Sequence, residues 1–138
     1  MARSRPSDRL RQLDVFAECT DAELAEIDRL SDAVTVPAGR TLIRQGDLGR
    51  EFLIVVSGEA VVSRDGVEVA RLGAGSYMGE LALLANVERN ATVTAGTEML
   101  VEVIDRRAFQ TLLEDSPSLC RSLLQGVAKR LASLESTD

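Results

Sequence analysis

Residues 33–104 consist of short apolar or alternating runs, and turn-forming residues separate each run from the next. Alternation over a few positions is typical of β-strands, whereas an amphipathic helix needs a longer pattern with a period of about 3.6 residues. Asp65-Gly66 lies between two alternating runs and favours a tight hairpin turn. Closely spaced strands with tight turns favour a sandwich or a barrel. The predicted strands are Val34–Val36, Thr41–Arg44, Glu51–Val56, Glu59–Ser63, Val67–Leu72, Ala91–Ala95 and Met99–Ile104.

Helical patterns precede the strands. Apolar residues at helical spacing predict a short helix over residues 8–16. Thr20 and Glu23 then have the spacing of a capping box, in which the Thr hydroxyl accepts from the third backbone amide and the Glu side chain reaches back to the first. This pattern predicts a helix from Asp21 to about Leu30.

Helical patterns also follow the strands. Asp105 is suited to cap a helix that runs to about Leu113. Ser116 and Pro117 provide an N-cap followed by proline at the first helical position, which predicts a last helix ending near residue 134. The leucine stripe of this last helix suits either a core or a dimer seam, and both alternatives stay open.

Composition limits the classes of function. The 138 residues suit one domain, the net charge of −6 disfavours broad nucleic-acid binding, and histidine is absent, which excludes histidine-based zinc sites and catalytic triads. Cys19 and Cys120 lie far apart in helical patterns and are interpreted as ordinary thiols. Met1–Ser7 has no apolar segment behind it, so a cytoplasmic protein without a membrane anchor is expected.

The segment Gly79–Leu84 has residues that favour a short helix inside the β region. A helix that begins at a glycine presents unpaired amides and a positive dipole end to an anion. Glu80 stands at the start of this helix, and Arg89 follows after a short loop. A carboxylate repels a lone phosphate but accepts hydrogen bonds from a ribose hydroxyl, so this pair of opposite charges predicts a nucleotide site.

Gly79-Glu80-Leu81-Ala82-Leu83-Leu84, followed by Arg89-Asn90-Ala91-Thr92-Val93, resembles the phosphate-binding cassette of the cyclic nucleotide-binding domain family. The resemblance extends to residues 43–47, 52–59 and 107–109 and to the last helix, so it covers nearly the whole chain. It implies a mainly β fold with flanking helices: a β-roll or jelly roll (double-stranded β-helix) over about 33–104, and C-terminal helices over about 105–135 that close over the ligand. Residues 1–138 would form a single domain.

The resemblance also implies roles for individual residues. Glu80 would bind the ribose 2′-hydroxyl and Arg89 the cyclic phosphate, while Gly79, Leu81 and Ala82 would contribute backbone contacts. Val62 and Ala70 would line the apolar pocket for the base. The implied ligand is cAMP, with cGMP as the alternative, and no cofactor, metal or catalytic residue is expected.

Two residues depart from the family pattern, and the chain's end is a third difference. Glu88 stands where the family often has proline, which adds a negative charge near the anion. Asn90 stands where a small residue or threonine is usual, and its amide could hydrogen-bond the phosphate or a purine edge. The residues that touch the adenine in the regulators would fall near residues 134–138, where this sequence stops.

Four functions remain in competition. The first is a sensor module that binds a cyclic nucleotide and acts on a partner protein or effector domain. In this function the chain is a monomer or a homodimer. The second is the ligand-binding half of a transcription regulator, with no nucleic-acid binding by this chain alone. The third, a degenerate module, would retain the fold without the ligand, with Glu80 and Arg89 forming only an ion pair. The fourth, a cupin-like metal protein or enzyme, is disfavoured because histidine ligands are absent.

Overall fold

The computed structural model describes residues 10, 12–79, 83 and 88–135. They fall into two compact units: a helical unit of residues 1–29 and 110–138, and a β unit of Leu30–Phe109. The described elements, in chain order, are η1 (Asp14–Phe16), α2 (Asp21–Leu30), β1 (Asp32–Val36), β2 (Thr41–Ile43), β3 (Glu51–Ser57), β4 (Ala60–Arg64), β5 (Val67–Leu72), β6 (Tyr77–Met78), β7 (Thr92–Ala95), β8 (Met99–Asp105), α4 (Arg106–Asp115) and α5 (Pro117–Glu135). No helix in the described part of the chain is long and apolar enough to cross a lipid bilayer.

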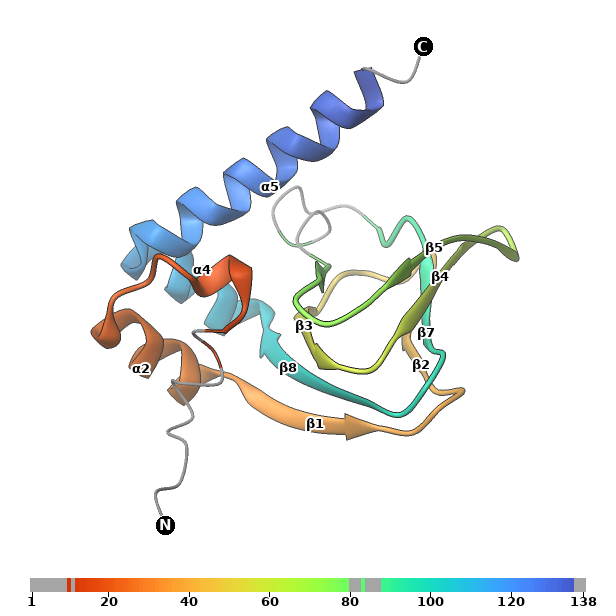
Figure 1. The fold of residues 1–138 in the computed structure, drawn as a ribbon, viewed down its shortest axis with the longest axis horizontal. Coiled ribbons are helices and arrows are strands. Elements are labelled where there is room, and N and C mark those ends of the chain that lie inside the picture. The colour runs from red at the N-terminus through yellow and green to blue at the C-terminus, as the bar shows by residue number, and fades with distance from the viewer. Residues whose placement is uncertain (1–9, 11, 80–82, 84–87, 136–138) are drawn as a thin grey trace. The chain divides into compact units, whose positions relative to one another are not determined.

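The β unit is a jelly roll. All described strand pairs are antiparallel, and the first strand pairs with the last, the second with the second-last, and so on inward: β1 with β8, β2 with β7, β3 with β6 and β4 with β5. This nested pairing divides the strands into two sheets, β1-β8-β3-β6 and β2-β7-β4-β5 (Figure 1). The predicted fold class is therefore confirmed.

The inner faces of the two sheets share one hydrophobic core. Period-two alternation places every second residue of each strand on this face. The core joins residues of both sheets: Val36, Ile43, Leu53, Val55, Ala60, Met78, Val93, Ala95, Met99 and Val101. Burial of these branched and aliphatic side chains provides the main stabilisation of the roll.

The outer face of strand β3 is also buried. Phe52 lies on this face, and its ring packs against Phe109 of α4 with a centroid separation of 4.8 Å and against Tyr77 at 5.7 Å. The β3 strand is thus apolar on both faces, which explains why its sequence reads as a continuous apolar run and not as an alternation.

Local turn chemistry agrees with the sequence. Asp65 and Gly66 have φ angles of 54° and 82°, as a primed two-residue turn requires, and they connect β4 to β5 as predicted. The predicted strand Val67–Leu72 has the observed bounds, and the other predicted strands differ from the observed ones by at most two residues at an end. The short strand β6 was not predicted.

The predicted N-terminal helix is partly wrong. Within the described residues, the stretch 8–16 contains a 3-10 turn over Asp14–Phe16 and a helical Leu10, while residues 1–9 and 11 lie outside them. The predicted helix over Asp21–Leu30 is confirmed. Its capping box is formed: the Glu23 amide donates to Thr20 Oγ1 at 3.1 Å, and the Thr20 amide donates to Glu23 Oε1 at 2.9 Å.

Glu23 has a second role that its position in α2 does not indicate. Ser116 Oγ donates to Glu23 Oε2 at 2.6 Å, and the Ser118 amide donates to the same oxygen at 3.3 Å. Ser116 is also the predicted N-cap of α5, which begins at Pro117. One carboxylate therefore ties the start of α2 to the start of α5 within the helical unit.

These contacts set the ionisation of Glu23. Burial raises the pKa of its carboxyl, but the hydrogen bonds from Ser116, Thr20 and Ser118 outweigh burial and lower the pKa from 4.5 to about 2. The folded state therefore binds the proton less tightly than the unfolded state. The stabilisation is complete above the unfolded pKa of 4.5 and is lost as the pH falls through about 2.

We expect Glu23→Gln to lower the free energy of unfolding at neutral pH by about 1 kcal/mol, because the charge-assisted bonds to Ser116 and Ser118 are weakened. The difference from the wild type should shrink between pH 4.5 and pH 2, because the Glu23 carboxyl of the unfolded protein takes up a proton in this range while that of the folded protein stays largely ionised. Urea unfolding at several pH values measures both effects. A difference that stays constant across this range would contradict the role of the charge.

Candidate functional site

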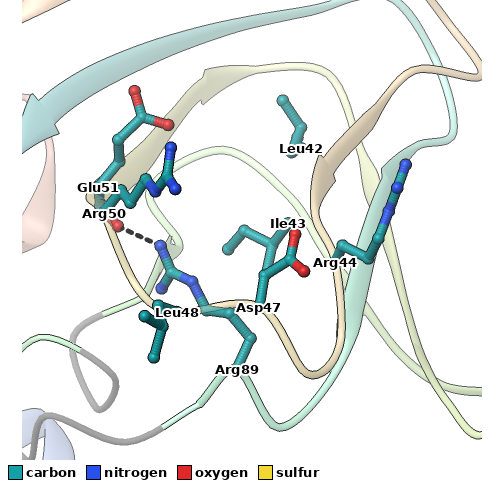
Figure 2. Close-up of a pocket in the computed structure, with 8 residues that line it drawn as sticks. All are labelled: Leu42, Ile43, Arg44, Asp47, Leu48, Arg50, Glu51 and Arg89. Carbon is teal, nitrogen blue, oxygen red and sulfur yellow. Dashed lines mark hydrogen bonds between the residues drawn. The ribbon is translucent and has the colours of Figure 1, made fainter.

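Arg89 is the charged side chain around which the site is built. It is 8% exposed, and its guanidinium donates from Nη1 to the Gly79 carbonyl at 3.1 Å and from Nη2 to the Glu51 carbonyl at 2.7 Å. Figure 2 shows the second bond reaching the Glu51 backbone, while the Glu51 carboxylate points away. Two backbone carbonyls thus hold a buried cation in one orientation.

The backbone of Arg89 is held as firmly as its side chain. Its amide donates to the Asp47 carbonyl at 2.8 Å, and its own carbonyl accepts from the Gly46 amide at 2.9 Å. An isolated bridge between Leu48 and Glu88 continues this pairing. Backbone hydrogen bonds therefore connect the segment before β7 to the loop between β2 and β3.

Gly79 is a position in the site where only glycine fits. Its φ angle is 95°, and a Cβ added there would lie 2.6 Å from Arg89 Nη1 and 2.6 Å from the Glu51 carbonyl oxygen. A side chain would suffer both a strained backbone and a clash with the guanidinium. The absence of a side chain therefore allows the close approach of Arg89.

Strand β6 places Gly79 there. Leu53 pairs with Met78 in the antiparallel ladder between β3 and β6, so the residue after Met78 lies toward the Glu51 end of β3. The Gly79 carbonyl also accepts a bond from the Leu83 amide at 3.4 Å, the i to i+4 pattern of a helical turn. The same carbonyl thus accepts hydrogen bonds from both the Arg89 guanidinium and the Leu83 amide.

Arg89 lines a pocket of about 360 Å³ together with residues of β2, of β3 and of the loop between them (Figure 2). Its lining includes three arginines and two acids, and Figure 2 shows Arg44 pointing away from Arg89. The lining residues are Leu42, Ile43, Arg44, Asp47, Leu48, Arg50, Glu51 and Arg89. A planar guanidinium fixed beside such an opening is suited to a phosphate or carboxylate oxygen.

The structure brings the predicted site residues together in two pairs. Gly79 lies against Arg89, and Val62 lies directly opposite Ala70 across β4 and β5. Val62 packs against the core between the sheets, and Ala70 shares its face but is exposed, so the inner face is uncovered at that point. Asn90 is exposed, and its carbonyl accepts from Arg64. Glu80, Leu81 and Ala82 lie outside the described residues.

Sequence reasoning missed the anchors of Arg89. The Glu51 carbonyl belongs to a mainly apolar strand, and its contact with Arg89 spans 38 residues. Gln45 was also missed, although it stands beside Gly46 and hydrogen-bonds the hairpin turn. No local pattern reports a bond to a backbone carbonyl from a distant segment.

The sequence matches the cyclic nucleotide-binding domain family over residues 33–116, which is more than half of the chain and includes both site pairs. The jelly roll, and Gly79 packed against the buried Arg89, agree with this match. The chain belongs to the cyclic nucleotide-binding domain family.

Individual relatives come from several kinds of protein. The cAMP-dependent protein kinase regulatory subunit of Schizosaccharomyces pombe is 34% identical over 82% of this chain and 28% of that protein. The regulatory domain of Toxoplasma gondii PKA, solved with cAMP, is 27% identical with a TM-score of 0.79 over 90% of this chain and 49% of that one. The N-terminal domain of a Streptomyces coelicolor transcriptional regulator is 32% identical with a TM-score of 0.72 over 94% and 96%. This chain spans only about a quarter of the S. pombe subunit.

The space at Gly79 can be tested against a matched glycine. Gly39 has a φ angle of 91° but has no atom within 4 Å of an added Cβ, so Gly39→Ala should cost only the strain of positive φ, about 1–2 kcal/mol. Gly79→Ala should lower the free energy of unfolding by clearly more, because the methyl group also displaces the Arg89 guanidinium. Urea unfolding of the two variants compares them. Equal losses would show that the contact with Arg89 is unimportant.

Proposed function

We propose that this chain binds a cyclic purine nucleotide, cAMP or alternatively cGMP, and acts as a non-catalytic sensor module. The observation that carries the proposal is the buried Arg89 guanidinium, held by two carbonyls against a glycine that no other residue can replace. Membership of the family and the cAMP-bound state of the T. gondii relative support it.

The charge of the site supports a cyclic phosphate. A cyclic phosphodiester carries a single negative charge, which one guanidinium balances, whereas a phosphate monoester carries about −1.5 to −2 at neutral pH. The protein has a net charge of −6, so a more highly charged ligand would meet more repulsion. Of these two kinds of phosphate, the singly charged diester therefore meets the smaller electrostatic repulsion when it pairs with the buried arginine.

The residues that would contact the sugar are assigned from the sequence, and those that would contact the base from their place in the β4–β5 hairpin. We assign Glu80 to the ribose 2′-hydroxyl, and the amides of Leu81 and Ala82 to the phosphate oxygens. Val62 and Ala70 form a cross-strand pair on the inner face of β4 and β5, where the exposure of Ala70 leaves apolar surface for a purine ring. Asn90 is exposed and near the phosphate end in sequence, and its amide is available to the ligand's edge.

The mechanism of sensing is a population shift. A ligand changes the balance between two arrangements of α4 and α5 only if it binds one of them more tightly. The partner is then an effector domain or protein that reads the favoured arrangement, or a second copy of the chain. Nucleic acid is not a direct partner in this proposal.

Thermal unfolding with cAMP, cGMP and 5′-AMP tests the proposal. A cyclic nucleotide at a hundredfold excess over its Kd should stabilise the protein by ~2.7 kcal/mol, which raises Tm by a few degrees, while 5′-AMP should have little effect. Arg89→Lys, which keeps the charge but loses the planar fork, should lose most of the shift, and Arg71→Lys, on exposed β5, should keep it. Absence of a shift with every cyclic nucleotide would instead favour the degenerate module.

The role of Glu80 can be separated from general damage with a modified ligand. Glu80→Ala should weaken cAMP binding by about tenfold or more, because the charged acceptor for the ribose hydroxyl is removed. The wild type should bind 2′-deoxy-cAMP as weakly as the variant binds cAMP, and the variant should bind both ligands equally. Calorimetry measures the four affinities. A variant that still prefers cAMP to its 2′-deoxy analogue would assign the ribose contact to another residue.

A second function is supported by a specific observation. The S. coelicolor relative is the N-terminal domain of a transcriptional regulator, and this chain covers 96% of it at 32% identity. Here the chain would be the ligand-binding half of such a regulator. Sequencing the gene beyond the codon for Asp138 decides between the two: a helix-turn-helix segment there would favour the regulator.

A further inference from the structure

Four segments of the β unit meet at the end of the β2-β7-β4-β5 sheet where Arg89 enters. Because β2 and β7 are antiparallel, the end of β2 meets the start of β7, with Ile43 opposite Val93. Because β7 and β4 are antiparallel, the start of β7 also meets the end of β4, with Thr92 opposite Ser63. The turn from β4 to β5 is therefore brought close to the residues just after β2 and just before β7.

Gln45 and Asp65 form a reciprocal pair across this end. Gln45 Nε2 donates to Asp65 Oδ1 at 2.8 Å, and the Asp65 amide donates to Gln45 Oε1 at 2.9 Å. Both polar atoms of the Gln45 side chain are used, and one of the two bonds reaches the backbone of a residue with positive φ at the tip of the hairpin. The pair therefore fixes the position of the turn as well as that of one side chain.

Two further bonds connect the same turn and the same loop to the segment of Arg89. Arg64 Nε donates to the Asn90 carbonyl at 3.0 Å. The Gln45 amide donates to Thr92 Oγ1 at 3.0 Å. The residues that follow Arg89 are thus bonded at two places. Arg64 of the hairpin contacts Asn90, and Gln45 of the β2–β3 loop contacts Thr92.

The strands are shaped for this contact. The ladder between β4 and β5 shifts register between Val62 and Ser63, and the ladder between β2 and β7 shifts between Thr41 and Ile43. Register shifts of this kind bend a strand and increase its twist. Both irregularities stand just before the residues that meet, so the bends lie where the hairpin tip must turn toward Gln45.

We propose that Gln45, Arg64 and Asp65 form a clamp that positions Arg89 for the ligand's phosphate. These three are positioning residues, because they act on the residues that follow Arg89 and not on its guanidinium. The proposal rests on the proposed function for the identity of the ligand. The geometry of the clamp is independent of it.

The clamp also connects the two halves of the site. The hairpin that it holds carries Val62 and Ala70 on its inner face, where the base is expected. A change in the hairpin's position therefore reaches the phosphate contact through Arg64 and Gln45. Binding at the base side and binding at the phosphate side should then be energetically coupled.

The first test needs no ligand. Amide hydrogen exchange should show that Gln45→Ala exchanges the Arg89 and Gly46 amides about tenfold faster, because the pairing of these two segments opens more often. Arg71→Ala is the matched control: Arg71 lies on the same hairpin, and its exposed ion pairs with Glu59 and Glu68 do not touch the clamp. The control should leave the Arg89 amide unchanged.

The second test measures positioning. Gln45→Ala should weaken cAMP binding by about tenfold in the wild-type background and much less in the Arg89→Lys background, because a positioning effect vanishes with the group it positions.

Gln45→Glu should also weaken binding, since it opposes two carboxylates. Adding Asp65→Asn should restore binding, because the asparagine amide supplies a donor and tolerates the positive φ.

Each result supports or overturns the clamp. Faster exchange together with non-additive loss of binding and rescue supports it. Unchanged exchange at Arg89 overturns it, and faster exchange with unchanged binding reduces the clamp to a purely structural contact. If the wild type binds no cyclic nucleotide, the proposed function fails, and the exchange measurement still decides whether Gln45 holds Arg89.

Discussion

The contact between the Arg89 guanidinium and the carbonyls of Glu51 and Gly79 is the constraint on which the site depends. A buried guanidinium is costly unless its donors are satisfied, so the surrounding backbone must supply acceptors in fixed positions. The Arg89 segment leads into β7 of one sheet, while Glu51 begins β3 and Gly79 follows β6 of the other. The same contact that fixes the guanidinium therefore joins the two sheets at one end of the roll.

The sequence predicted much of the fold because its signals are local. The Asp65-Gly66 turn, the capping box of Thr20 and Glu23, and the Ser116 cap each depend on residues a few positions apart, and all three are formed. Strand β6 escaped prediction because two residues have no detectable period, and only pairing with β3 defines them. The bond between Glu23 and Ser116 spans 93 residues and has no sequence signature.

In the candidate site, too, local features were predicted from the sequence and long-range contacts were not. Gly79 and Arg89 were predicted from the residues themselves and from the family resemblance, and the structure supplies the reason for their association: the φ angle and the missing space at Gly79. Their common partner, the Glu51 carbonyl, could not be predicted, because every residue has a carbonyl and only tertiary structure selects one. Glu80 and its neighbours lie outside the described residues, so their assignment remains a proposal from the sequence.

A jelly roll with nested strand pairs brings residues distant in sequence to one end of a sheet, and this has a consequence for ligand discrimination. The β4–β5 hairpin carries the surface expected to meet the base, and it contacts the arginine segment through Arg64 and Gln45. A ligand that fits the phosphate but displaces the hairpin must also strain the Arg89 segment, so it loses affinity at both places. Selectivity for the base then does not require a hydrogen bond to the base itself. In this way a site whose base contacts are the apolar Val62 and Ala70 can still discriminate between purines.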